Sequence, residues 1–482
     1  MSSLFCFDTR SLAAARILAG LLLLGDLLNR SKFLAAHYTS EGALPALAVF
    51  QELRDVGFPS IYFVNDTPLF VTLLFLLSGV AALALTVGYH TRLSTALCWY
   101  LYASVQYRNP LINTGGDVLL KFLLLWCIFV PWGAEWSVDK LLRRQPAVGR
   151  AVSCTGVTVL GLQMVLLYLS SVANKWHPTW VKDGTALYYA LSVDHITTPY
   201  AQFLYRRPAL MEGLTFAVVG SEFLGGLLLL VPRPRLRLVV VPAFLFMHFS
   251  FGIFIELGIF RYAPMVGLLA FLPSLFWDKL PAFSTPSRSK KAALIKALQK
   301  LPRPPRYQFD WAGQPGRFFL IAAFTYGVLT CLQGLADQRL IPRPIDRLGW
   351  ALGLNQHWPM FIYLDKVKDG WYVMEAELAD GTVVDLIHGG PVDFEKPTSM
   401  GRTYEGVRWR RFMTNIIMPP SQAVLPWYSK YVRREWDEQH PDNPIMKLTL
   451  YFMNDPQRLY YRYTPADKRI LDIWVKPEGQ DA

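Results

Sequence analysis

Residues 68–88 read PLFVTLLFLLSGVAALALTVG, a run of apolar and small side chains that contains no charged residue. A helix of about 20 such residues is long enough to cross the hydrocarbon core of a bilayer. Similar runs recur along the chain, and two of them, 93–107 and 117–131, are short. The sequence therefore predicts an all-α bundle of about nine transmembrane helices, at 11–28, 68–88, 93–107, 117–131, 151–173, 213–231, 238–256, 258–276 and 317–333.

The composition agrees with a polytopic membrane protein. Of the 482 residues, 52% are hydrophobic and only 17% are charged, whereas about a quarter of the residues in soluble proteins are charged. Five cysteines are too few for a disulfide scaffold in a chain of this length.

The net charge of +12 is carried by the first two thirds of the chain. Residues 1–316 hold 28 Lys and Arg against 16 Asp and Glu, and residues 317–482 hold 20 of each. The basic residues fall in short segments between apolar runs, a pattern that indicates membrane topology rather than nucleic-acid binding. The segments contain Lys140, Arg143, Arg144 and Arg150; Arg233, Arg235 and Arg237; and the basic loop 278–316.

If these three segments are cytoplasmic, nine spans place the N-terminus inside and everything after residue 333 outside. The outer part changes character, because GWYVMEAELADGTVVDLI at 370–387 predicts two strands joined at Asp380-Gly381. Residues 446–455 and 458–475 predict further strands, the latter with a turn near Pro465. We therefore expect a transmembrane domain at 1–333 and a β-rich extracytoplasmic domain at 334–482.

Sequence motifs for several common chemistries are absent. The chain has no phosphate-binding loop, no dinucleotide-binding glycine motif, no C-x-x-C pair and no G-x-S-x-G elbow. The eight histidines show no metal-ligand spacing, so we expect no metal.

Ionisable residues inside apolar runs are the first candidates for function, because burying a charge in a membrane is costly. Glu222 and His248 are such residues, and each suits either interhelical hydrogen bonding or a reaction site. Asp117 and Lys121 have the i, i+4 spacing of a helical ion pair. Glu256 and Arg261 flank a tight reversal, where we expect a simple surface pair.

Lys175 directly follows the apolar run 151–173, in YLSSVANKWHPTWVKDG. One interpretation is a membrane anchor, with Trp176 and Trp180 in an aromatic belt. The other is a general base, since apolar surroundings favour the neutral amine, which can accept a proton. The spacing does not choose between them.

Several stretches, in order along the chain, resemble the bacterial HTTM (horizontally transferred transmembrane) domain family, relatives of vitamin K-dependent γ-glutamyl carboxylase. They are GYHTRL, YRNPLINTGGD, WGAEWSVDKLL, NKWHPTWVKDGTALYYAL, MHFSFGIFIELGIFRYAPM with FLPSLFWD, and DGWYVMEAELADGTVVDL. The carboxylase has a Lys shortly before a Trp-Val pair, which here is Lys175 before Trp180-Val181. The resemblance implies that Lys175 deprotonates vitamin K hydroquinone, and that oxygen then yields a strong base for adding CO2 to glutamate.

The same resemblance matches His248 to a family His before a G-x-F stretch, and Glu222 to an acidic position in the preceding helix. One departure concerns an Asn-His pair that precedes YWSVD in the carboxylase and assists carboxylation. This chain has Gly133-Ala134-Glu135 there instead, which leaves quinol deprotonation in place and puts carboxylation in doubt.

The NPLINTGGD stretch is typical of the bacterial family members. Its Asn109, Asn113 and Asp117 would either hydrogen-bond a ligand headgroup or, for Asp117, cap a helix.

The resemblance leads us to expect a multi-pass enzyme of a bacterial cytoplasmic membrane. Lys175 would be catalytic, and His248, Glu222, Asn109, Asn113, Asp117, Trp176 and Trp180 would bind a quinone. The cofactor would be vitamin K hydroquinone or menaquinol, with O2 and CO2 as co-substrates, no metal, and a glutamate-containing peptide as a further partner. The alternative is a non-catalytic membrane protein that binds a lipid, a quinone or a protein through its outer domain. A membrane acyltransferase ranks last, because it would rest on His248 alone.

Overall fold

The computed structural model describes residues 4–53, 57–142, 150–280, 313–362, 369–397, 400, 404–455 and 465–477. Most of the predicted basic loop 278–316 therefore lies outside the described residues, as do Arg143, Arg144 and residues 458–464 of the last predicted strand.

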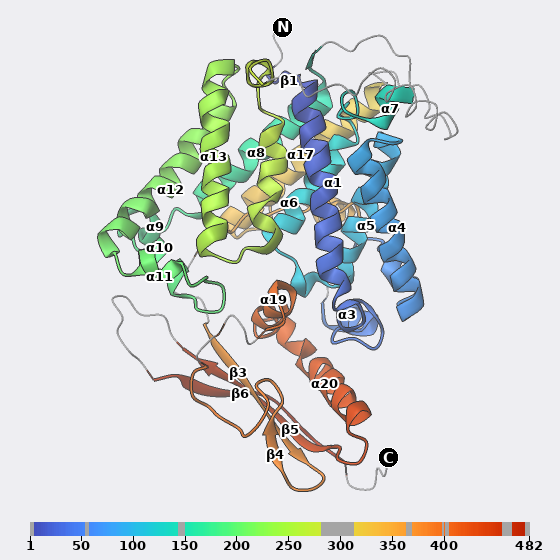
Figure 1. Cartoon of the computed structure of the whole chain (residues 1–482), viewed down its shortest axis with the longest axis vertical. Helices are drawn as coiled ribbons and strands as arrows, with labels where there is room; N and C mark the ends of the chain where they lie inside the picture. The colour runs from blue at the N-terminus through green and yellow to red at the C-terminus, as the bar shows by residue number, and fades with distance from the viewer. Residues whose placement is uncertain are drawn as a thin grey trace.

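A helical bundle forms the larger part of the molecule (Figure 1). Among the described residues, six helices are long and apolar enough to cross a membrane. They confirm six of the predicted runs: α1 (Thr9–Ser31), α4 (Pro68–Val87), α8 (Thr155–Asn174), α12 (Pro208–Leu229), α13 (Pro234–Phe254) and α17 (Gly313–Ala336).

The other three predicted spans take different forms, so the count of nine stays a prediction. Residues 93–107 lie in α5 (Thr91–Arg108), and residues 117–131 overlap the 13-residue α6 (Gly115–Cys127). The run 258–276 is divided into η3 (Gly258–Arg261), α14 (Ala263–Leu269) and α15 (Ser274–Trp277). Gly258 has a left-handed φ of 57° and Pro273 precedes α15, so the backbone does not continue as one helix.

Helix α6 lies at the centre of the bundle, with nearly all of its side chains buried. It packs against α5, α8 and α14, while α8 also contacts α12 and α17. By contrast, α4, α12 and α13 expose large apolar side chains, as expected of surfaces that face lipid. Examples are Leu69, Leu76, Val80, Phe223, Leu224, Val239 and Phe246.

Short elements connect the long helices. They are β1 (Phe7–Asp8), β2 (Ala151–Val152), α2 (Leu34–Tyr38), α3 (Ala46–Glu52), α7 (Val138–Leu142), α9 (Pro178–Val181), α10 (Ala186–Ser192), α11 (Ala201–Tyr205), α18 (Arg343–Ala351), η1 (Ile61–Phe63), η2 (Pro110–Ile112) and η6 (Ser421–Val424).

The C-terminal region contains an antiparallel sheet in the order β4-β3-β5-β6. Its strands are β3 (Gly370–Leu378), β4 (Val383–Asp385), β5 (Ile445–Asn454) and β6 (Asp467–Val475). The predicted hairpin at Asp380-Gly381 is confirmed, and Gly381 has the positive φ (81°) that this turn requires. Helices α19 (Val407–Ile416) and α20 (Leu425–Gln439) join the sheet to the bundle. The sheet lies at the end opposite the N-terminus (Figure 1), which we call the sheet end.

The chain between α18 and β3 returns to the bundle before it enters the sheet. Gln356 is buried, accepts a hydrogen bond from Gln163 of α8 (2.8 Å), and its carbonyl accepts one from Thr330 of α17 (2.9 Å). This segment thus contributes polar groups to the interior of the helical bundle.

Candidate functional site

Lys175 and Glu222 form a buried ion pair near the sheet end. Lys175 is the C-cap of α8, and Glu222 lies within α12, which packs against α8. The Lys175 Nζ lies 2.7 and 2.6 Å from the two Glu222 carboxylate oxygens. Lys175 is 2% exposed and Glu222 is 4% exposed, so solvent does little to weaken their attraction.

Two further residues of α8 complete a polar row that the sequence did not single out. Ser171 accepts a hydrogen bond from Lys175 Nζ (3.0 Å) and donates one to Glu222 (3.1 Å). One turn further along, the Tyr168 hydroxyl lies 2.9 Å from His248 Nε2. Because residues 168, 171 and 175 are spaced i, i+3 and i+7, they share one helix face. This spacing is the sequence signal that could have identified Ser171 and Tyr168 as neighbours of Lys175.

The two tryptophans are placed differently. Trp180 is buried, its ring lies 5.0 Å from Lys175 Nζ, and its indole N–H donates to the Phe361 carbonyl (2.8 Å). Trp176 is 78% exposed. The structure therefore brings Lys175, Glu222 and Trp180 into contact, places the Tyr168–His248 pair further along α8, and leaves Trp176 at the surface.

Asp117 belongs to a second cluster, at the junction of the bundle with α19. Its carboxylate accepts hydrogen bonds from Arg30 (2.6 Å), from Arg408 (2.8 and 2.9 Å) and from Tyr102 (2.9 Å). Asp26 binds both arginines, at 2.6 Å from Arg30 and 2.5 Å from Arg408. Asp117 also forms a capping box with Thr114, so the helix-cap interpretation is confirmed.

The four charges of Asp26, Arg30, Asp117 and Arg408 cancel, and we call this group the charge quartet. Burial lowers the pKa of the Arg408 guanidinium, but the two carboxylates outweigh this effect and raise it above its ordinary value. In this closed network of four salt bridges, the charges bind one another and not a ligand.

Asn109 and Asn113 lie beside the charge quartet, apart from Lys175. Asn109 donates to the His37 carbonyl (3.2 Å), and Asn113 donates to the Gln106 carbonyl (2.8 Å). The side-chain oxygen of each is buried, with no hydrogen-bond partner among the described residues.

Two predicted ion pairs are wrong. Asp117 does not bind Lys121, because Arg30 and Arg408 occupy its oxygens. Glu256 binds Arg410 of α19 (2.6 Å) instead of Arg261, whose guanidinium donates to the Gly252 carbonyl (3.4 Å). In both cases an arginine of α19, far away in the sequence, binds the acidic residue: Arg408 binds Asp117, together with Arg30 of α1, and Arg410 binds Glu256.

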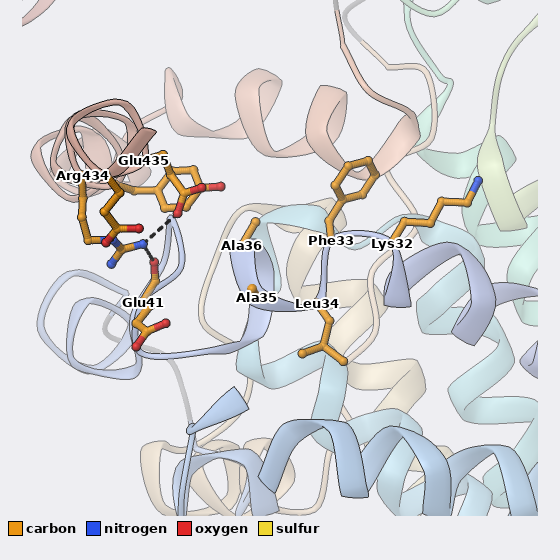
Figure 2. A pocket seen from close by; sticks show the side chains of 10 residues that line it. Lys32, Phe33, Leu34, Ala35, Ala36, Glu41, Arg434 and Glu435 are labelled. Carbon is orange, nitrogen blue, oxygen red and sulfur yellow. Dashed lines mark hydrogen bonds and ion pairs between the residues drawn. The ribbon is translucent and has the colours of Figure 1, made fainter. Parts of the chain in front are cut away.

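A cavity of about 240 Å³ opens between the end of α1, α2 and α20, and it contains no predicted site residue. Figure 2 shows the Arg434 guanidinium turned toward Glu435 and the Glu41 backbone, while Lys32 points away from them. Among the residues that the structure describes, no group of three His, Cys, Asp or Glu side chains is placed to hold a metal ion.

These features define a class: a multi-pass membrane protein with a buried polar site between apolar helices. The chain belongs to the HTTM domain family, whose model matches residues 6–276 and so includes Lys175, Glu222 and His248. It is also similar to the uncharacterized protein YitO of Bacillus subtilis, with 27% identity over 210 residues. That alignment covers 39% of this chain and 63% of YitO. No solved structure matches significantly.

Proposed function

We propose that this chain is a membrane enzyme that uses Lys175 as a base toward a lipid-soluble hydroquinone. The observation that carries this proposal is the buried contact of Lys175 with Glu222 and Ser171. The HTTM domain is also found in vitamin K-dependent carboxylase, which supports the same chemistry by relationship.

Glu222 gives Lys175 a way to become a base. In a buried site, the neutral pair of amine and carboxylic acid competes with the ion pair, because both charges lose their hydration. A proton that moves from Lys175 Nζ to Glu222 leaves a free amine beside the Trp180 ring. Ser171 can then donate to Glu222 or accept from Lys175, as its two present contacts show.

His248 and Tyr168 provide a second proton-exchanging pair on the same side of α8. Their 2.9 Å contact joins a hydroxyl to an imidazole nitrogen, and the other ring nitrogen has no partner among the described residues. We assign them the task of orienting the hydroquinone oxygen, which supplies the acidic proton. Trp180 would stack on the ring.

The remaining expectations extend this proposal. The hydroquinone would be vitamin K hydroquinone or menaquinol, with O2 as oxidant and CO2 added to a glutamate-containing peptide. The protein would reside in a bacterial cytoplasmic membrane with the sheet outside. The competing function is binding of a lipid or quinone without turnover. It is favoured by the three hydrogen bonds that the Lys175 ammonium already donates to Ser171 and Glu222, because an ammonium held in this way does not accept a proton.

The deciding experiment uses the full chain in nanodiscs with reduced vitamin K or menaquinol, oxygen and labelled bicarbonate. Quinone epoxide and label fixed on a glutamyl peptide are followed separately. We expect Lys175→Ala and Lys175→Arg to abolish epoxide formation, since arginine keeps the charge but does not lose its proton. The exposed neighbour Lys182 provides the control Lys182→Ala. Bound quinol without any product in the wild type would select the binding function.

A further inference from the structure

Lys121 is a second buried lysine, and its surroundings differ from those of Lys175. It lies in α6 and is 3% exposed. No carboxylate of the described residues lies within ion-pair distance of it, and its polar contact is the Tyr107 hydroxyl at 3.5 Å. Its Nζ also lies 5.1 Å from the centre of the Tyr107 ring and 5.2 Å from that of Phe122.

The Lys121–Tyr107 pair has more hydrogen-bond donors than the acceptors that surround it among the described residues. An ammonium carries three N–H groups, of which Tyr107 accepts one. The Tyr107 hydroxyl then retains its own hydrogen as a donor. Two ring faces stabilise the positive charge partly, but they do not replace an acceptor. This donor set fits an oxygen atom of a ligand.

A purely structural role does not explain a lysine at this position. An unpaired buried charge costs several kcal/mol in a membrane bundle, whereas methionine fills the same space without that cost. The side chains around Lys121 include several aromatic rings. Tyr107 stacks on Phe58 (4.8 Å between centres, 10° between planes), and Phe122 stacks on Trp126 (6.0 Å, 28°).

The depth of Lys121 in the bundle can be derived from helix geometry. Helices α6 and α8 run antiparallel, since Gly156 at the start of α8 packs on the Phe129 backbone just beyond the end of α6. Trp126 of α6 donates to Gln163 of α8 (3.1 Å). Lys121 and Tyr168 are each five residues, or about 7.5 Å, from that contact toward the sheet end. Lys121 is thus level with the Tyr168–His248 pair.

One segment passes close to both lysines. Gly353 approaches the Phe58 ring and the Tyr107 ring. Four residues later, His357 lies 3.2 Å from Asn174, the neighbour of Lys175. The carbonyl of Phe361 then accepts from Trp180. The Lys121 site and the Lys175 site are therefore walled by the same stretch, 353–361.

We propose that Lys121 and Tyr107 bind an oxygen of a lipid-soluble quinone or quinol. The two donors hold the oxygen next to the rings of Tyr107 and Phe122. This site would fix the affinity for the ligand, while Lys175 acts on its proton. The ligand class rests on the proposed function, but the assignment of Lys121 and Tyr107 rests on their burial and contacts.

Binding of radiolabelled menaquinone-4 to the full chain in nanodiscs tests the proposal. Loss of the hydrogen bond from the Lys121 ammonium should weaken binding about tenfold or more in Lys121→Met. Loss of the hydrogen bond from the neutral hydroxyl should weaken it about threefold or more in Tyr107→Phe. The exposed Lys182→Met should bind within about twofold of the wild type. Tyr107→Phe removes a single oxygen, so it keeps the test informative if Lys121→Met does not fold.

The outcomes separate the two proposals. Unchanged binding in both Lys121→Met and Tyr107→Phe overturns the Lys121 site and leaves the role of Lys175 standing. No binding by the wild type overturns both. Binding of oleate to the wild type and to Lys121→Met is then measured in the same way as binding of menaquinone-4. If oleate binds in a Lys121-dependent manner and menaquinone-4 does not, the site takes a carboxylate and the quinone assignment is wrong.

Discussion

Lys175 and Lys121 show how the same residue type serves different chemistry according to its partners. Lys175 is charge-paired, because Glu222 lies within 2.7 Å of its Nζ at both oxygens. Lys121 contacts one hydroxyl and two rings. A buried lysine with a carboxylate can exchange a proton locally, whereas one without a carboxylate is left to bind something else.

The Lys175–Glu222 pair predicts a strong coupling between substitutions. Glu222→Gln leaves a buried ammonium without its counter-ion and should lower the free energy of unfolding by about 3–5 kcal/mol. Adding Lys175→Met to Glu222→Gln should recover most of that loss, because no charge then remains buried. A double-mutant cycle on thermal unfolding in detergent measures the coupling. Additive losses would show that the pair contributes nothing beyond packing.

His37 predicts a pH dependence of stability. Burial, followed by the charges of Arg30 and Arg408, lowers its pKa to about 3. The unfolded chain therefore binds a proton below a pH of about 6.5 that the folded protein does not bind, so stability falls as pH decreases through this range. Between pH 6.5 and 4.5 the loss should be about 2 kcal/mol. His37→Phe keeps the ring against Trp409 and should show a shallower decline, measured by unfolding at several pH values.

At the residue scale, the sequence identified the charged and polar residues within apolar segments better than it identified their binding partners. Lys175, Glu222 and His248 are recognisable because charged or polar groups are rare within apolar runs. Ser171 and Tyr168 attract no notice in a sequence, since hydroxyls are common in helices. Arg408 could not be assigned to Asp117 from the sequence, because the bond joins positions 291 residues apart.

Helix α19 is the element that attaches the C-terminal sheet to the bundle. Arg408 on this helix completes the charge quartet, and Arg410 binds Glu256 and the His195 carbonyl. The face of α19 that carries these arginines is buried although the helix lies outside the apolar spans. The sheet is therefore positioned by ion pairs with the bundle.

Loss of Arg408 should weaken this attachment. Arg408→Met leaves two aspartates facing one arginine, so we expect a loss of about 3–5 kcal/mol and faster proteolysis between α18 and β3. Arg408→Lys should rescue only part, because lysine does not reproduce the forked contacts to Asp117 and Asp26. The matched control is Arg411→Met, an exposed position on the same helix whose guanidinium donates one hydrogen bond to the bundle, at the Asn113 carbonyl (3.2 Å). Equal proteolysis rates for Arg408→Met and Arg411→Met would contradict the role of the quartet.

Long elements were predictable and short buried ones were not. Six long apolar runs became six helices, since a run of about 20 apolar residues has few alternatives. Helix α6 is short because protein surrounds it and lipid thickness does not set its length. The strands β3, β4 and β5 form where the period-2 sequence pattern predicted strands. The return of residues 353–358 into the bundle carries no such pattern.

At the scale of the whole molecule, the two ends of the bundle differ. Cys6 is exposed at the end that carries the N-terminus, and the sheet lies at the other end (Figure 1). We expect the spans in between to place these ends on opposite sides of the membrane.

The predicted orientation can be tested with thiol labelling. In intact cells, a membrane-impermeant maleimide should label Gly389→Cys, which lies in an open turn after β4. It should label Cys6 only after permeabilisation. Cys98, Cys127 and Cys331 are buried and should stay unlabelled in the folded protein. Labelling of Cys6 but not of residue 389 in intact cells would invert the orientation.

The charge quartet also has a consequence for synthesis. Asp26 and Arg408 are 382 positions apart, and a ribosome that adds about 5–20 residues per second needs about 20–80 s to cover that distance. During this time α1 and α6, which carry Asp26 and Asp117, are made before Arg408 is available. Arg30 can bind Asp26 on its own helix at once, but Asp117, the other of the two carboxylates, then has no second arginine until Arg408 is made. The nascent protein thus requires the insertion machinery, or water at the membrane surface, to shelter an acidic group until α19 arrives.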